Sequence, residues 1–152
     1  YSFAALRKSG EWETFPIGLT IRGPFFDADS FPGIVFSPSN EPTHSFRFGL
    51  RLQMGWSDGA AENGYLGIAG LFAEGGLFVT PRVLASVETG FSGIFISSMD
   101  GTKTNGEGPF FGIALNYLPE SDSYGVRIGI YWDWTPGYAG AISATLSCLF
   151  LW

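Results

Sequence analysis

The sequence is poor in charge, in cysteine and in histidine. Asp, Glu, Lys and Arg make up 14% of its 152 residues, against roughly 25% in an average soluble domain. One cysteine excludes an intrachain disulfide framework, and a single histidine beside it leaves no donor set for a Cys/His site, so we expect neither a metal nor a cofactor. The 8 basic residues are outnumbered by 14 acidic ones, and the net charge of −6 disfavours nucleic-acid binding because phosphates are repelled.

The chain also lacks an apolar run suited to a membrane-spanning helix. Such a helix needs about 20 predominantly apolar residues, and the longest uncharged stretch, 134–152, contains Pro136 and polar residues at alternate positions. The chain opens at Tyr1 with no signal peptide, so we expect a processed form. Aromatic residues reach 17%, which excludes a disordered chain, and the length predicts a single domain over residues 1–152.

Large apolar residues alternate with small or polar ones along most of the chain. In the stretches 46–56 and 126–134 the residues of one parity are Phe46, Phe48, Leu50, Leu52, Met54, Trp56, Val126, Ile128, Ile130, Trp132 and Trp134. The residues between them include glycines and isolated charges such as Arg51 and Arg127. A β-strand places these two sets on opposite faces of a sheet.

The length and polarity of these segments predict strands that cross a membrane. They run about 10 to 14 residues, whereas a globular strand averages roughly 5–6 and a membrane-spanning strand needs about 9–11. The face with the charges has too few long polar side chains to coat a soluble exterior, so we assign it to a narrow lumen and the apolar face to lipid. The alternative is a soluble sandwich with one buried face, which would expose more Lys, Glu and Thr.

Eight strands can be read from the sequence. We expect them at 1–7, 14–25, 44–57, 64–74, 82–97, 109–118, 124–135 and 138–152, separated by turns rich in Gly, Pro, Asp and Ser. The segment 64–74 is apolar on both parities, so its faces stay unassigned. The predicted fold class is all-β: a closed antiparallel transmembrane β-barrel of about eight strands in an up-and-down meander.

The long alternating strands, the polar loops and the terminal aromatic residue resemble the small outer-membrane β-barrels of Gram-negative bacteria, the OmpA/OmpX-like class. In that class the last strand ends in an aromatic residue preceded by apolar residues at alternate positions, and the barrel-assembly machinery recognises this end. The resemblance implies that Leu146, Phe150 and Trp152 form the assembly signal here, with Cys148 at the intervening lipid-facing position. It also implies a place in the outer membrane of the cell envelope, with the lipid bilayer and the assembly machinery as partners.

Charged residues on the small-residue face are expected to meet inside the barrel. These residues are Arg47, Arg51, Glu88, Arg127 and Asp133. We predict that they form a structural lumen charge network, because charges in a narrow barrel must pair. A proton or ion path is the alternative, although the interior of an eight-stranded barrel is just filled by side chains and leaves no open pore.

The longest connection, 27–43, contains three prolines and an apolar centre. Prolines lack the backbone donor that a central strand needs, so we read the segment as a loop. Its residues Phe31, Ile34, Val35 and Phe36 are expected to bind a partner protein, since exposed apolar clusters usually mark interaction sites. The alternative is a plug over the barrel mouth.

We find no catalytic motif in the sequence and expect no catalytic residues. The predicted function is that of a structural or anchoring barrel, or a subunit of an envelope complex. A lipid A-modifying hydrolase is one alternative, with His44 as base, although Ser45 next to it would point to the opposite face of the strand. A small channel or porin-like subunit is the other alternative.

Overall fold

The computed structural model describes residues 1–8, 11–15, 17–28, 44–58, 63–98, 103–119, 124–134 and 141–150. These residues form one antiparallel sheet of nine strands. The strands are β1 (Ser2–Lys8), β2 (Glu11–Phe15), β3 (Ile17–Ala28), β4 (His44–Asp58), β5 (Asn63–Thr80), β6 (Val83–Ser98), β7 (Lys103–Tyr117), β8 (Tyr124–Asp133) and β9 (Ala141–Phe150). No helix long and apolar enough to cross a membrane occurs in this described part of the chain.

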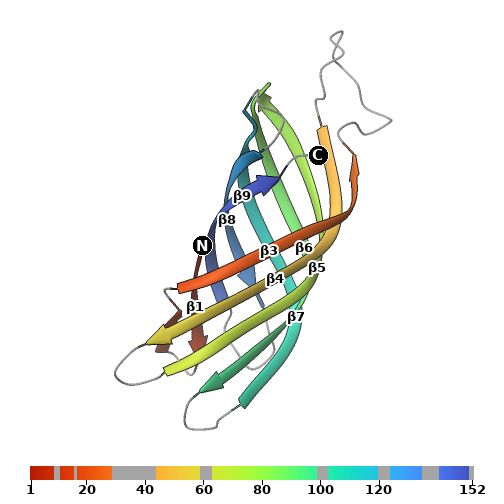
Figure 1. The fold of residues 1–152 in the computed structure, drawn as a ribbon. Coiled ribbons are helices and arrows are strands. Elements are labelled where there is room, and N and C mark those ends of the chain that lie inside the picture. Colours follow the sequence, from red (N-terminus) through yellow and green to blue (C-terminus); the bar gives the residue numbers. More distant parts are fainter. Residues whose placement is uncertain are drawn as a thin grey trace.

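Seven long strands, β3 to β9, form a nearly closed barrel in which each strand pairs with its neighbour in sequence (Figure 1). The short β1–β2 hairpin pairs with β9, so that β2 lies at one edge of the sheet and β3 at the other. The predicted all-β up-and-down barrel is therefore confirmed, with seven long strands in place of about eight.

The strand count differs from the prediction because the N-terminal region forms short strands. The expected strand 14–25 is divided between β2 and β3 at residue 16, which is a proline and has no N–H to donate to a ladder. The expected N-terminal strand is β1, and it pairs with β9 over the five positions Ser2 to Leu6.

The hairpin connections alternate between the two ends of the barrel. One end carries the tight turn between β5 and β6, the β7–β8 connection, the end of β9 and the two strand ends that flank 29–43. We call this the C-terminal end; it is at the top in Figure 1. The strand ends that flank the long connection therefore lie at the end of the barrel where β9 finishes.

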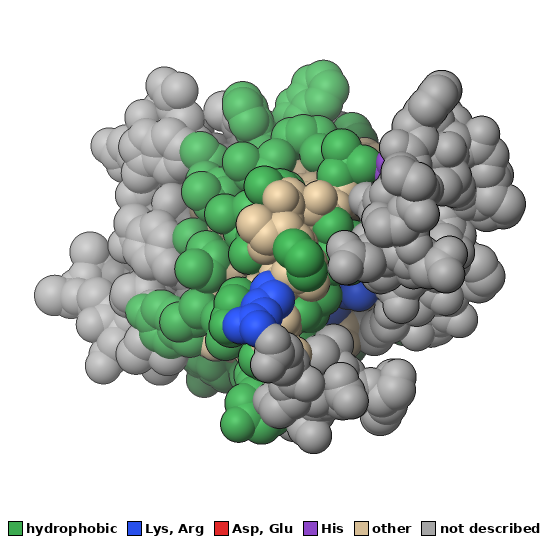
Figure 2. Space-filling model, turned by 90° about the horizontal axis from the view of Figure 1, so that it is seen from above, with side chains coloured by type: hydrophobic (Ala, Val, Ile, Leu, Met, Phe, Trp, Pro, Cys, Tyr) green, Lys and Arg blue, Asp and Glu red, His purple; other side chains and the backbone are tan. Residues whose placement is uncertain are grey.

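The outer face of the barrel is apolar. Along β8 the exposure alternates at every residue, with Val126, Ile128 and Ile130 exposed and the residues between them buried. The same holds on β4 for Phe48, Leu50, Leu52 and Met54, and hydrophobic side chains make up most of the coloured periphery in Figure 2. Exposed aliphatic and aromatic side chains over buried polar ones are the pattern of a lipid-facing barrel. The predicted face assignment is confirmed on these strands.

The strand that could not be assigned from sequence is β5, and the structure settles its faces. Its even-numbered residues point inward, and Leu66, Ile68, Ile94 and Ile96 form an apolar cluster in the lumen toward the end opposite β9's C-terminus. Its odd-numbered residues, such as Leu71, are exposed on the outer face. Both parities are apolar because this part of the lumen is itself filled by aliphatic side chains.

Candidate functional site: a charge network in the lumen

Six charged side chains meet inside the barrel. They come from β3, β4, β5, β6 and β8 and are Arg22, Arg51, Glu74, Glu88, Arg127 and Asp133. Five of them are at most 3% exposed, and three positive charges meet three negative ones. Because buried charges are costly unless they are paired, this balance is what a filled, dry lumen requires.

The ladder register places like charges beside each other on the barrel wall. Arg22 lies directly opposite Arg51 across β3 and β4, and Glu74 lies opposite Glu88 across β5 and β6. Like charges in this arrangement destabilise a sheet. The ion pairs that neutralise Arg22, Arg51 and Glu88 join strands that are not neighbours, and Glu74 in addition lies opposite Arg47 across β4 and β5.

Arg51 and Asp133 form the first cross-lumen pair, between β4 and β8. Arg51 Nη1 and Nη2 each donate to a different Asp133 oxygen at 2.9 Å, which is the bidentate geometry of a strong guanidinium–carboxylate contact. Ser92 Oγ adds a third donor to Asp133 at 2.8 Å, and Arg51 also donates to Gln53 Oε1 and Ser143 Oγ. These contacts join four strands in one layer.

Arg127 of β8 pairs with both glutamates on the facing wall. Its Nη1 donates to Glu74 Oε1 at 2.8 Å and its Nη2 donates to Glu88 Oε2 at 2.9 Å. Arg22 of β3 pairs with the same Glu88 oxygen. Asn116 Oδ1 accepts a further hydrogen bond from Arg127 at 2.8 Å. None of these ion pairs joins neighbouring strands, so each ties together strands that have at least one other strand between them.

Tyr131 lies between the two groups of charges. Its hydroxyl oxygen accepts hydrogen bonds from Arg22 Nη1 at 2.8 Å and from Arg127 Nε at 3.1 Å. Its ring centroid is 4.5 Å from the guanidinium carbon of Arg51 and 5.2 Å from that of Arg22, within the range of cation–π contact. One side chain thus contacts all three lumen arginines.

Glycines on neighbouring positions make room for the Tyr131 ring. A Cβ added at Gly112, which pairs with Tyr131 across β7 and β8, would overlap the ring, and one at Gly129 would lie 2.5 Å from the hydroxyl oxygen. The ring therefore lies flat against the inner wall over two residues without side chains. The glycine-rich face recognised in the sequence is the space that this ring occupies.

Apolar side chains close the lumen around the charges. Phe72 and Phe110 pack with Tyr131 in one buried cluster, and Phe72 and Phe110 lie under the guanidinium groups of Arg22 and Arg51, with centroid distances of 4.5 and 4.9 Å. Leu84, which is fully buried, lies on the side of the C-terminal end.

The structure brings together four of the five charged residues singled out in the sequence. Arg51, Glu88, Arg127 and Asp133 share this layer, and Arg47 lies half-buried on the same face of β4, closer to the C-terminal end. It lies opposite Glu74 across β4 and β5.

Two further members, Arg22 and Glu74, were missed in the sequence. Arg22 shares the parity of Gly18 and Thr20, and Glu74 is the single charged residue of β5. A lone charge on a long apolar strand needs a buried partner, and that signal could have identified Glu74.

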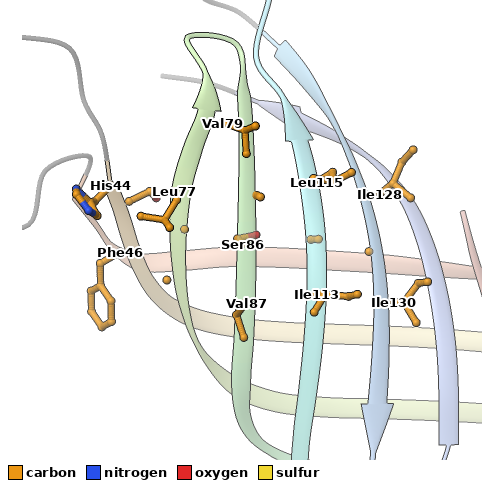
Figure 3. A pocket seen from close by; sticks show the side chains of 16 residues that line it. His44, Phe46, Leu77, Val79, Ser86, Val87, Ile113, Leu115, Ile128 and Ile130 are labelled. Carbon is orange, nitrogen blue, oxygen red and sulfur yellow. The ribbon is translucent and has the colours of Figure 1, made fainter. Parts of the chain in front are cut away.

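The other predicted site residues lie outside the network. His44 is half-buried on the outer side of β4, where it borders a groove in the wall, and Ser45 is buried on the inner side (Figure 3). That groove has no carboxylate in its lining. Among the described residues of that lining, none could act as the acid that orients a catalytic histidine.

Several predicted residues fall outside what the structure describes. The proposed partner-binding residues Phe31, Ile34, Val35 and Phe36 and the terminal Trp152 lie beyond the described ranges, and of Phe150 only the backbone is described. Leu146 and Cys148 are exposed on the outer face of β9. Among the described residues, no group of three or more His, Cys, Asp or Glu side chains could hold a metal ion.

Comparison with known proteins shows similarity at the level of structure. No protein-family model matches the sequence, and no curated protein matches it. The crystal structure of Ail, the attachment invasion locus protein of Yersinia pestis, is similar with a TM-score of 0.62 and 9% sequence identity, over 99% of this chain and 93% of Ail. A second structure of Ail, in complex with the heparin analogue sucrose octasulfate, gives a TM-score of 0.63 and 10% identity over the same shares. The chain therefore has the fold of the small outer-membrane β-barrels of the OmpX/Ail class.

Proposed function

We propose that this protein is a non-conducting structural barrel of the outer membrane, which serves as an anchoring element or as a subunit of an envelope complex. The fold and the apolar outer face embed it in a lipid bilayer. The observation that carries the proposal is the lumen, where three arginines and three carboxylates neutralise each other across the barrel. In this layer each arginine contacts a carboxylate, which is the arrangement of a structural network.

Conductance in planar bilayers tests this proposal. The refolded barrel is expected to give no current steps, because Phe72, Phe110 and Tyr131 pack together in the lumen beside the charged layer. A variant with all three aromatic residues replaced by Ala serves as the control, since it removes this packing and should raise the current if it still inserts. Unit steps from the wild-type barrel that scale with ion concentration would overturn the proposal in favour of a small channel.

The segment 27–43 is proposed as the contact with a partner protein in such a complex. Both of its flanking strand ends, Ala28 and His44, lie at the C-terminal end of the barrel, and its apolar centre supports an interaction role. Replacing Phe31, Ile34 and Phe36 by Ser should leave heat-modifiable migration unchanged and abolish copurification of the partner. A triple variant that unfolds at a much lower temperature, with nothing copurifying with the wild type, would identify the segment as a plug.

A further inference from the structure

The outer wall of the barrel is hollowed near its C-terminal end. The groove extends over β5 to β8, with His44 and Phe46 of β4 at one side, and has a volume of about 900 Å³ (Figure 3). The side chains along it that point outward are aliphatic and exposed; examples are Leu77, Leu115 and Ile128.

Small residues in two adjacent rows of the wall produce the hollow. The ladder places Ala85 between Leu77 and Leu115 in one row, and Gly75 between Phe46 and Val87 in the next. Each row therefore has one small residue between two large side chains. These small residues, Gly75 and Ala85, lie on the neighbouring strands β5 and β6. A Cβ built at Gly75 meets no atom within 4 Å, so the space above this residue is open.

We propose that this groove holds an acyl chain of a bilayer phospholipid. The groove is continuous with the exposed apolar face that meets lipid. Of the described residues that line the groove, His44 alone has an ionisable side chain. A methylene group fills about as much space as a water molecule, ~30 Å³, so a chain of about 16 carbons needs roughly 500 Å³ and fits. In a bilayer the gain comes from van der Waals packing, which a chain held between aliphatic rims provides and a flat wall does not.

The test compares two glycine substitutions on the same strand. Gly75→Leu fills the groove. Gly67→Leu adds the same side chain at another outer position of β5, where a Cβ meets Phe95 at an ordinary 3.9 Å. Each barrel is refolded in vesicles containing a phosphatidylethanolamine with a diazirine on one acyl chain, irradiated, and digested for mass spectrometry. Lipid retention after transfer to mild detergent is measured by native mass spectrometry, and heat-modifiable migration reports folding.

We expect the wild type and Gly67→Leu to retain one phospholipid and to crosslink at the groove segments 75–87 and 113–130. Gly75→Leu should lose the retained lipid and most of the crosslinks there. Ala85→Leu is the second groove-filling variant if Gly75→Leu does not fold.

Three results would overturn the proposal: no retained lipid on the wild type, equal retention by Gly75→Leu, or a wild-type dimer that Gly75→Leu dissociates. The last result would assign the groove to a second copy of the chain. None of these outcomes bears on conductance through the lumen. The lipid-binding proposal and the proposed function can therefore be refuted separately.

Discussion

Neutralising Arg51 and Asp133, singly and together, tests whether ion pairs across the lumen hold the barrel closed. Arg51→Gln removes the counter-ion of the Asp133 carboxylate, which is 1% exposed. The Ser92 hydroxyl still donates a hydrogen bond to this carboxylate. Asp133→Asn leaves a fully buried guanidinium without its counter-ion. Removing one partner of a buried pair costs about 3–5 kcal/mol. Either single variant should therefore lose about that much unfolding free energy.

The double variant, Arg51→Gln with Asp133→Asn, should recover most of the loss. Both side chains are then neutral amides that can hydrogen-bond each other and Ser92, so the remaining cost is that of imperfect neutral hydrogen bonds, about 1–2 kcal/mol. Each single variant should be less stable than the double variant by about 1–4 kcal/mol. This order arises only if the two charges compensate each other in the folded barrel.

Urea unfolding in phospholipid vesicles, followed by heat-modifiable migration on gels, measures these free energies. Glu107→Gln is the matched control, because it removes a carboxylate at an exposed position of β7 and should change stability by no more than about 0.5 kcal/mol. Additive losses in the double variant would refute the reasoning. Single variants within about 1 kcal/mol of the wild type would refute it as well.

Three further outcomes are expected. Gly112→Ala should destabilise the barrel by about 1–3 kcal/mol in the same urea assay, because its methyl group overlaps the ring on the next strand, whereas Gly67→Ala should be nearly neutral. His44→Ala should leave the lipid A of the host membrane unchanged in mass spectra, and an altered acyl pattern would support a hydrolase. Trp152→Asp should impair membrane insertion in cells much more than Leu151→Asp, and equal effects would remove the assembly-signal interpretation.

Period-two alternation predicted most of the fold, because a lipid-facing wall demands large apolar side chains at every second residue. It was sufficient on β4, β7 and β8, where the inner face carries mostly small, polar or charged residues. It failed on β5, because the lumen beside that strand is filled by aliphatic residues such as Leu66 and Ile68, so both faces are apolar. The N-terminal strands were harder to predict, since β1 and β2 are short and the expected strand 14–25 falls partly in β2 and partly in β3.

The charge network was only partly predictable for a different reason. Parity identifies which charges point inward, but which charges meet depends on the stagger of strands that are far apart around the wall. The contact of Arg51 with Asp133, for example, joins β4 to β8. The position of Tyr131 over Gly112 likewise depends on the register between two strands and not on any local pattern.

The central claim is that the inward face of the barrel is closed to water while the outward face meets lipid. Accessibility of nitroxide labels along β9, at positions 142 to 146 in a Cys148→Ser background, tests it most directly. Ile142, Ala144 and Leu146 are exposed on the outer face, and Ser143 and Thr145 are at most 3% exposed inside. Labels at the three outer positions should be relaxed by oxygen from the bilayer, and labels at the two inner positions should be shielded from both oxygen and a water-soluble nickel complex. Strong relaxation by the nickel complex at positions 143 and 145 would show an open aqueous lumen and contradict the account.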